Sequence, residues 1–301
     1  MTLSKKPSRK TASTKQAAVS VTLDRQAIQG FLAAIAASSD GDALSTAQDV
    51  IYDAWEQATS TSRIALARKA LAISPLCADA YNLLADEAKT PEKARDLYIR
   101  GVEAGHLALG PGGFEEFDGH FWGFLETRPY MRARHGLAMS LLQLGEEDAA
   151  LEHFRAMLKL NPNDNQGIRY LLLAGLLRRD DLPGAKTLLA AYGDEWSANW
   201  LYTRALIAFR ENAGAKPATL KLLKDAQSSN KHVPAILAGI EPPVINDSGY
   251  VTMGGPDEAT DYLLEFGKAW KDTPGAIAWL LDTAGSAIPK RTSAKTPATK
   301  A

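Results

Sequence analysis

The sequence predicts an all-α protein, built as a right-handed solenoid of helical hairpins. Apolar residues recur with helical spacing from Leu23 to Leu281, and no segment shows the alternation of polar and apolar residues that a half-buried strand requires. Residues 129–162 also carry a complete helix-turn-helix repeat. Because one hairpin cannot bury its own apolar face, this repeat predicts neighbours of the same kind.

The repeat at 129–162 has the small and large residues that two crossing helices need. Counted from Met131, its pattern positions hold Leu137, Ala138, Leu141, Gly145, Ala150, Phe154, Met157 and Pro162. The alanines let the helices approach, the bulky residues fill the space beside them, Gly145 permits a tight turn, and the final proline ends the second helix. This is the pattern of a tetratricopeptide repeat, so the predicted fold is a tetratricopeptide-repeat superhelix over residues 23–282.

Several helices are expected before the repeat at 129–162. The first three are expected over residues 24–37, 43–58 and 62–74. The second of these has Val50, Ile51, Ala54 and Trp55 on one face, which we expect to point inward. Pro75 closes the third, so the second and third helices form a degenerate repeat.

A second degenerate pair follows, with Tyr81 in its first helix and Pro91 at the start of its second. The pattern then stops, because residues 105–128 contain six glycines together with aromatic residues and two histidines. An irregular loop is expected there, with its aromatic residues packed onto the solenoid. A metal site in this loop stays an alternative, with His106, Glu115, Glu116, Asp118 and His120 as candidate ligands.

Helical pairs resume after the clean repeat. The expected helices cover residues 165–178, with Asp164 as the cap, then 182–192, 197–210 and a partner that begins at Pro217. A Pro/Gly-rich loop at 241–255 separates them from two final helices. Residues 257–282 are expected to cap the exposed end of the solenoid.

Charge is unevenly distributed along the chain. Residues 1–20 carry five cations and residues 286–301 carry four, without any acid, whereas the rest holds 25 basic and 35 acidic residues. Both ends are poor in large apolar residues, so residues 1–22 and 283–301 are expected to be disordered basic tails. Weak contact with nucleic acid through these tails is one alternative role.

Several classes of protein are excluded by what the sequence lacks. No apolar stretch is long enough to cross a membrane, and no secretory signal pattern is present. Cys77 is the only cysteine, which excludes an internal disulfide and fits a reducing compartment. No residue has the local context of a catalytic nucleophile. We therefore expect a soluble, cytoplasmic protein that is not an enzyme and has no metal or cofactor.

Three blocks of sequence occur together in this chain. They read GHFWGFLETRPYMRAR at 119–134, NPNDNQGIRYLLL at 161–173, and HVPAILAG at 232–239 with EATDYLLEFGKAWKDTPGAIAWL at 258–280. With these blocks the chain resembles bacterial tetratricopeptide-repeat proteins related to the suppressor of tumorigenicity 7 family, over roughly residues 75–282. The resemblance implies a helical-repeat fold and no assigned catalytic activity.

In a repeat of this type, four positions of each first helix face the concave groove. The clean repeat and its successor give the candidate peptide-groove residues Arg132, His135, Met139, Gln143, Gln166 and Arg169. Arginine and glutamine beside apolar residues suit a peptide that carries an acidic group and an apolar anchor. The alternative is that Arg132 and Arg169 form ion pairs within the repeats.

The predicted function is a non-catalytic scaffold or adaptor that binds a protein or peptide in this groove. This prediction rests on the repeat pattern and on the lack of a recognisable catalytic motif. An enzyme or metal-binding protein that uses residues 105–128 is the alternative from another functional class.

Overall fold

The computed structural model describes residues 41–246 and 250–284. Within these residues every regular element is a helix, from α2 to α14. The predicted helix at 24–37 and the tail at 1–22 lie outside the described residues, as does the tail at 283–301 apart from its first two residues.

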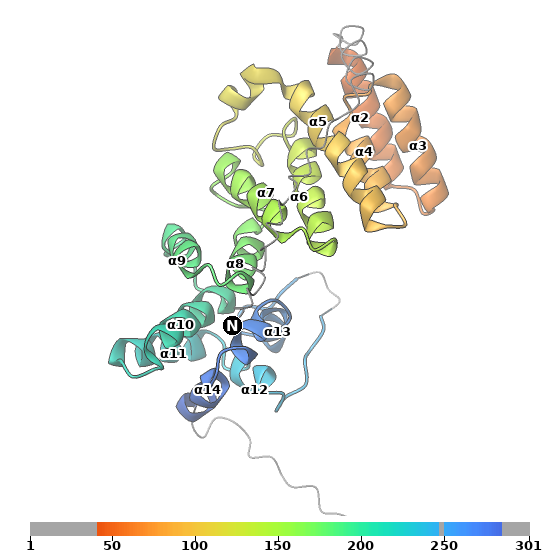
Figure 1. Ribbon diagram of the computed structural model, residues 1–301. Helices are drawn as coiled ribbons and strands as arrows, with labels where there is room; N and C mark the ends of the chain where they lie inside the picture. Colours follow the sequence, from red (N-terminus) through yellow and green to blue (C-terminus); the bar gives the residue numbers. More distant parts are fainter. Residues whose placement is uncertain (1–40, 247–249, 285–301) are drawn as a thin grey trace, which may run out of the picture.

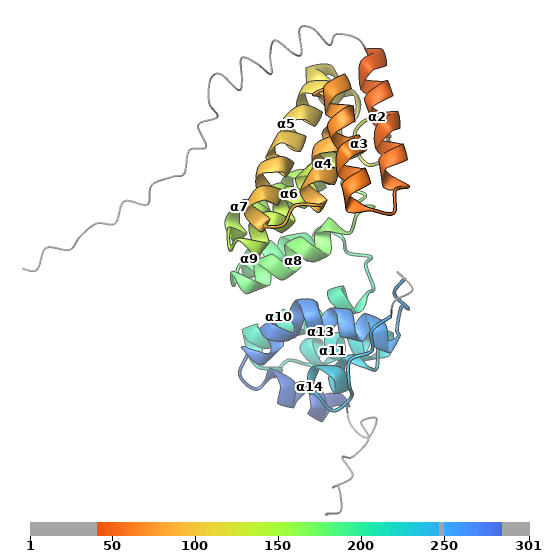
Figure 2. The ribbon, with the colours of Figure 1, turned by 90° about the vertical axis from the view of Figure 1, so that its right-hand side faces the viewer.

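The helices follow one another as antiparallel pairs that stack along the molecule (Figure 1). The pairs are α2 (Gly41–Trp55) with α3 (Ser60–Ile73), α4 (Ala78–Asp86) with α5 (Pro91–Glu116), α6 (Arg128–Gln143) with α7 (Glu147–Leu160), α8 (Ile168–Arg178) with α9 (Leu182–Ala191), and α10 (Ala198–Asn212) with α11 (Pro217–Ser229). Figure 2 shows α8 and α9 between the α2–α7 group above and the α10–α14 group below. The predicted fold class, an all-α solenoid of helical hairpins, is confirmed.

The α6–α7 hairpin forms as its residue pattern predicts. Ala138, Ala150 and Phe154 are fully buried where the two helices meet, and Gly145 turns the chain between them with φ +77°, a conformation that glycine adopts without strain. The following helix begins at Ile168, three residues later than expected. Its first amides are satisfied by Asp164, whose carboxylate accepts hydrogen bonds from the backbone N–H of Ile168 (2.7 Å) and of the next residue (2.9 Å).

The expected irregular loop at 105–128 is wrong for its first half, because α5 continues to Glu116. The helix kinks at Gly110, where φ is +62°, and Pro111 then starts a new helical stretch, since the first turn needs no N–H from that residue. The irregular segment is therefore confined to residues 117–127. It packs through its aromatic residues, as expected: Phe121 is fully buried, with its ring centroid 6.1 Å from that of Tyr130.

Three further helices close the C-terminal side: α12 (Val233–Leu237), α13 (Pro256–Lys271) and α14 (Ala276–Ala284). The sequence predicted the last two and missed α12. Helix α13 contacts both α8 and α10. The buried carboxylate of Glu258 anchors it there, because it accepts hydrogen bonds from the backbone N–H of Ala198 and from the side chain of Asn230, both at 2.9 Å.

The tightest helix contact lies at Gly136, under the ring of Tyr98. A Cβ at Gly136 would lie 2.1–2.6 Å from three ring carbons. We expect Gly136→Ala to lower the free energy of unfolding by about 2 kcal/mol, because an overpacked core must shift to relieve the clash. Urea denaturation measures this change.

Gly112→Ala is the matched control, because nothing lies within 4 Å of a Cβ at that position. Alanine favours helix over glycine by about 1 kcal/mol, so this variant should be at least as stable as the parent. Equal destabilisation by the two substitutions would contradict the proposed contact.

Candidate peptide-binding groove

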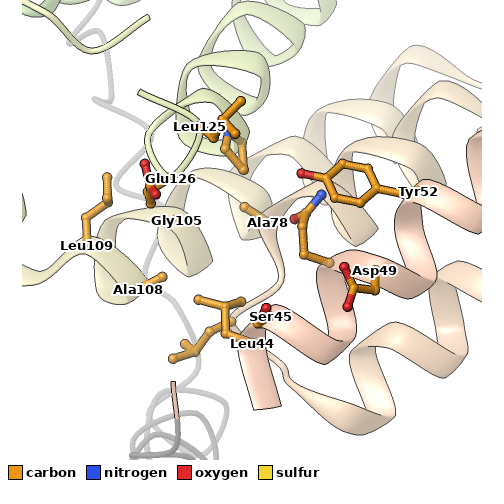
Figure 3. Close-up of a pocket in the computed structure, with 13 residues that line it drawn as sticks. Leu44, Ser45, Asp49, Tyr52, Ala78, Gly105, Ala108, Leu109, Leu125 and Glu126 are labelled. Carbon is orange, nitrogen blue, oxygen red and sulfur yellow. The ribbon is translucent and has the colours of Figure 1, made fainter. Parts of the chain in front are cut away.

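Two pockets lie at opposite ends of α4, one near its first residue and the start of α6, the other near its last residue and the end of α6. The first, here called the N-terminal pocket, has a volume of about 410 Å³ and is shown in Figure 3. Its walls come from α2, the start of α4, the middle of α5 and the end of the 117–127 segment. The residues that line it are Leu44, Ser45, Gln48, Asp49, Tyr52, Leu76, Ala78, Gly105, Ala108, Leu109, Leu125, Glu126 and Pro129.

Large apolar side chains stand open to solvent at this pocket. Tyr52 is 47% exposed and Leu125 is 63% exposed. Trp55, one turn along α2, is 44% exposed, with its ring centroid 5.6 Å from that of Tyr52. The expectation that Trp55 points inward is therefore wrong. The inward face of α2 is formed by Ala47, Val50, Ile51 and Ala54.

The carboxylate of Asp79, in the first turn of α4, lies fully buried beside the pocket. It accepts hydrogen bonds from the side chains of Gln48 on α2 (3.0 Å) and Asn82 on α4 (3.0 Å). Arg132 on α6 completes the cluster with two bonds, one from Nε at 2.8 Å and one from Nη2. A single buried charge thus joins three successive first helices.

Arg132 is one of the six predicted groove residues, and its charge is already compensated by Asp79. The guanidinium also lies 5.4 Å from the ring centre of Trp55, a distance suited to a cation–π contact. The side chain is one third exposed. Arg132 therefore lines neither pocket and instead ties α6 to Asp79 on α4 and to Trp55 on α2.

Three predicted residues, His135, Met139 and Gln143, line the second pocket, which has a volume of about 530 Å³. Asp86 and Tyr98 line it as well, and the phenol of Tyr98 donates a hydrogen bond to Asp86. Burial raises the pKa of both groups and lowers the pKa of His135. At neutral pH the imidazole of His135 is accordingly uncharged, so it can exchange hydrogen bonds with a bound chain but offers no cation.

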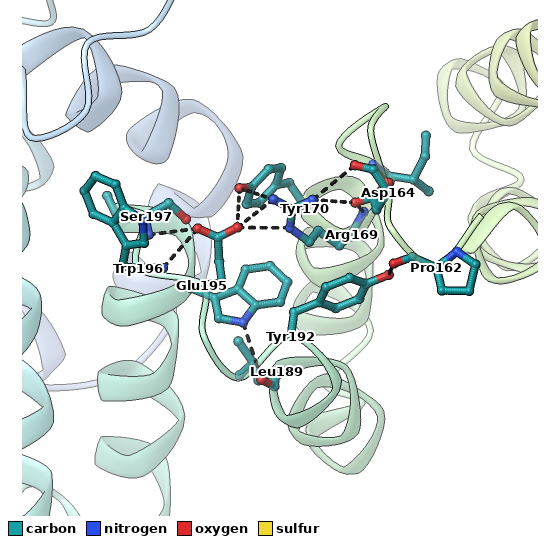
Figure 4. Close-up of polar contacts among 12 residues, drawn as sticks. Pro162, Asp164, Arg169, Tyr170, Leu189, Tyr192, Glu195, Trp196 and Ser197 are labelled. Carbon is teal, nitrogen blue, oxygen red and sulfur yellow. Dashed lines mark hydrogen bonds and ion pairs between the residues drawn. The ribbon is translucent and has the colours of Figure 1, made fainter. Parts of the chain in front are cut away.

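The remaining two predicted residues lie apart, at the start of α8. Arg169 donates to the carboxylates of Asp164 (2.9 Å) and Glu195 (3.1 and 2.6 Å), as Figure 4 shows. Its guanidinium lies 4.4 Å from the ring centre of Tyr170 and 5.5 Å from that of Tyr192. Both predicted arginines thus form ion pairs, but that of Arg132 joins two hairpins, whereas the alternative expected pairs within one repeat. Gln166 is half-buried in the same region.

Glu195 links this cluster to the next helical pair. It also accepts hydrogen bonds at 3.0 Å from the backbone N–H groups of Trp196 and Ser197, just before α10. Burial opposes ionisation of Glu195, but hydrogen bonds from Tyr170 and Arg169 outweigh it and lower its pKa to about 2. The cluster therefore connects α8 to α10 through a stable negative charge.

Among the described residues, no group of three or more His, Cys, Asp or Glu side chains could hold a metal ion. His106, a candidate ligand in the sequence, instead packs with its ring centroid 4.8 Å from that of Phe114. No helix in the described part of the chain is both long and apolar enough to span a membrane.

Sequence reasoning missed the residues that shape the N-terminal pocket. Tyr52 and Trp55 are large aromatic side chains beside the apolar face of α2. A helix that needs only one buried face has more apolar residues here than that face requires, and this surplus could have indicated an exposed binding surface. Leu109 and Leu125 carried no signal, because the loop expected at 105–128 gave no indication of the face that either would occupy.

The fold and groove together define an α-solenoid protein of the tetratricopeptide-repeat class. The chain belongs to the ST7 family, since the family model described as "ST7 protein" matches residues 18–295. The relatives named here are animal proteins and give no support to the bacterial subgroup that the sequence suggested.

A "Protein ST7 homolog" of Drosophila pseudoobscura pseudoobscura is 27% identical over 263 residues, which cover 79% of this chain and 48% of the relative. A human "Suppressor of tumorigenicity 7 protein-like" is 27% identical over 262 residues, covering 79% and 45%. The chain thus spans about half the length of the curated relatives it matches. Among solved structures, YrrB, described as a TPR protein with an unusual peptide-binding site, has a TM-score of 0.43 and 19% identity, covering 66% of this chain and 91% of YrrB.

Removing the buried charge tests its role in holding the groove together. We expect Asp79→Ala to lower the free energy of unfolding by about 2–4 kcal/mol, because Arg132, Gln48 and Asn82 all lose their acceptor. Asp53→Ala, at an exposed acid on α2, is the control and should change stability by less than about 0.5 kcal/mol. Equal denaturation midpoints for the two variants in urea would contradict this role.

The pH dependence of stability tests the Glu195 cluster. The pKa of Glu195 is lowered from an ordinary value near 4.5 to about 2, so its stabilisation is complete above about pH 5 and is lost as the pH falls towards 2. We expect Glu195→Gln to cost about 2–3 kcal/mol at pH 7 and progressively less down to pH 3. Urea titrations across this range measure it, with Asp194→Asn as the neighbouring control. A difference that stays constant with pH would refute the assignment.

Proposed function

We propose that this chain is a non-catalytic scaffold that binds a protein or peptide along α2, α4 and α6. The observation that carries the proposal is the N-terminal pocket, which is preformed and rimmed by the exposed side chains of Tyr52 and Leu125. Its volume of about 410 Å³ lies in the range typical of ligand sites, roughly 300–1,000 Å³. Exposed apolar side chains grouped at a concave site are typical of binding surfaces.

The binding mode follows from the lining of the pocket. An apolar side chain of the partner enters between Leu44, Leu109 and Leu125, and the partner's backbone passes over Tyr52. The wall is held in place by the Asp79 cluster, so little ordering is needed when the partner binds. A pre-organised wall of this kind favours affinity without any change of fold.

The six residues predicted from sequence take different roles in this proposal. His135, Met139 and Gln143 extend the binding surface into the second pocket. Arg132 ties α6 to α4 and α2 through Asp79 and Trp55. We assign Gln166 and Arg169 no contact with the partner, because Arg169 is engaged by carboxylates on both sides.

A cytoplasmic place of action is part of the same proposal. Cys77, whose presence as a lone cysteine suggested a reducing compartment, is fully buried. Burial raises the pKa of its thiol to about 12, so the reactive thiolate form is disfavoured at neutral pH.

Photo-crosslinking tests the proposal at the pocket. A photoreactive amino acid placed at position 52 or 125 should give covalent adducts with the partner in cell extract, because both side chains stand at the rim. The same amino acid at position 264, where Leu264 is 74% exposed far along the chain, is the control for nonspecific adducts.

The adducts must also depend on the apolar rim. The double variant Tyr52→Ala/Leu125→Ala should bind the crosslinked partner at least about tenfold more weakly. Two large apolar side chains that become buried on binding contribute more than about 1.4 kcal/mol. Leu264→Ala/Ile245→Ala removes two apolar side chains elsewhere that are still more exposed, at 74% and 82%, and should bind as the parent does. Indistinguishable adducts at all three positions would count against the groove.

A further inference from the structure

We propose that the N-terminal pocket selects a basic segment of its partner, one that carries Lys or Arg next to a large apolar side chain. This inference rests on the proposed function and adds the charge of the partner. The expected charge of the partner is therefore opposite to that predicted from sequence, where the two groove arginines suggested an acidic peptide.

The charge at the pocket is negative. Among the described residues that line it, Asp49 and Glu126 are the only ones with a formal charge. Both are exposed. Figure 3 shows Glu126 and Asp49 on opposite sides of the pocket, with Leu44 below and Leu125 above.

In the part of the chain that the structure describes, neighbouring cations do not compensate these two carboxylates. Arg132 is paired with Asp79 through both Nε and Nη2. Arg128, at the start of α6, donates to the backbone carbonyl of Trp122 at 3.0 Å and lies 5.5 Å from the centre of that residue's ring. No ion pair to Asp49 or Glu126 forms within residues 41–246 and 250–284.

The arrangement of charge and apolar surface defines the segment that fits. A large apolar side chain enters among the leucines, which places the partner's backbone between the two carboxylates. Lys and Arg side chains before and after this anchor are long enough to reach Asp49 on one side and Glu126 on the other. Their ammonium or guanidinium groups then form charge-assisted hydrogen bonds at the rim.

The net charge of the chain between its two basic ends favours the same partner, although the whole chain carries only −1. Outside residues 1–20 and 286–301, acids outnumber bases by 35 to 25. A net negative body attracts basic segments and raises their rate of association, whereas it repels acidic peptides and nucleic acid.

A peptide array tests this inference with the full chain. The array holds 15-residue synthetic peptides in matched sets, which share an apolar anchor and differ only in whether Lys/Arg or Glu/Asp flank it. We expect the parent chain to bind the basic set at least tenfold more tightly. Asp49→Asn/Glu126→Gln should lose most of this preference, and Asp49→Lys/Glu126→Lys should invert it.

Asp225→Asn/Glu265→Gln is the matched control, because it removes two exposed charges far from the pocket and should keep the preference of the parent. A preference for acidic peptides, or a basic preference that survives neutralisation of Asp49 and Glu126, would overturn the inference. The proposed function has a separate readout. If Tyr52→Ala/Leu125→Ala binds every peptide as the parent does, the groove itself is refuted.

Discussion

The fold around the groove depends on the buried carboxylate of Asp79. A charge in the protein interior is tolerated only when hydrogen bonds and an opposite charge compensate it. Here the compensation comes from Gln48 on α2 and Arg132 on α6, the first helices of the hairpins before and after the α4–α5 hairpin. The first helices of three successive hairpins therefore have to keep one relative position. The shape of the N-terminal pocket, to which all three contribute lining residues, is a consequence of that constraint.

The same solution recurs where the solenoid turns towards its C-terminal side. Arg169 on α8 is held by Asp164 before it and Glu195 after α9, with aromatic rings against its planar face. Arginine suits such a position because its planar, permanently charged group can serve two carboxylates and stack at the same time. In this chain the arginines at groove positions therefore join helices. In the proposed binding mode, recognition falls to apolar side chains and to acids that no described cation pairs with.

In this member of the ST7 family, the residues that hold the helices together differ from those of the proposed binding surface. The chain covers about half of the animal relatives, so the matched region is only part of a longer protein in those cases. Within the matched region, the rigid contacts and the proposed binding surface are made by different residues. Changes at Asp79 or Gly136 act on the fold, whereas changes at Tyr52, Leu125 or Asp49 act on the proposed partner, and the two kinds of effect can be measured separately.

Helical periodicity by itself determined the hairpin array, because residues three and four apart decide which face of a helix is apolar, and Ala138, Ala150 and Phe154 lie buried as their pattern requires. Only the tertiary structure decided what the groove presents. Asp79 and Arg132 are separated by 53 residues. No local pattern could therefore reveal that Arg132, a predicted groove residue, is already paired with a carboxylate. From the local sequence, Gly110 and Pro111 predict the end of a helix. In the structure the helix resumes after them, where the following aromatic residues pack against α6. The pocket exists only where such distant segments meet.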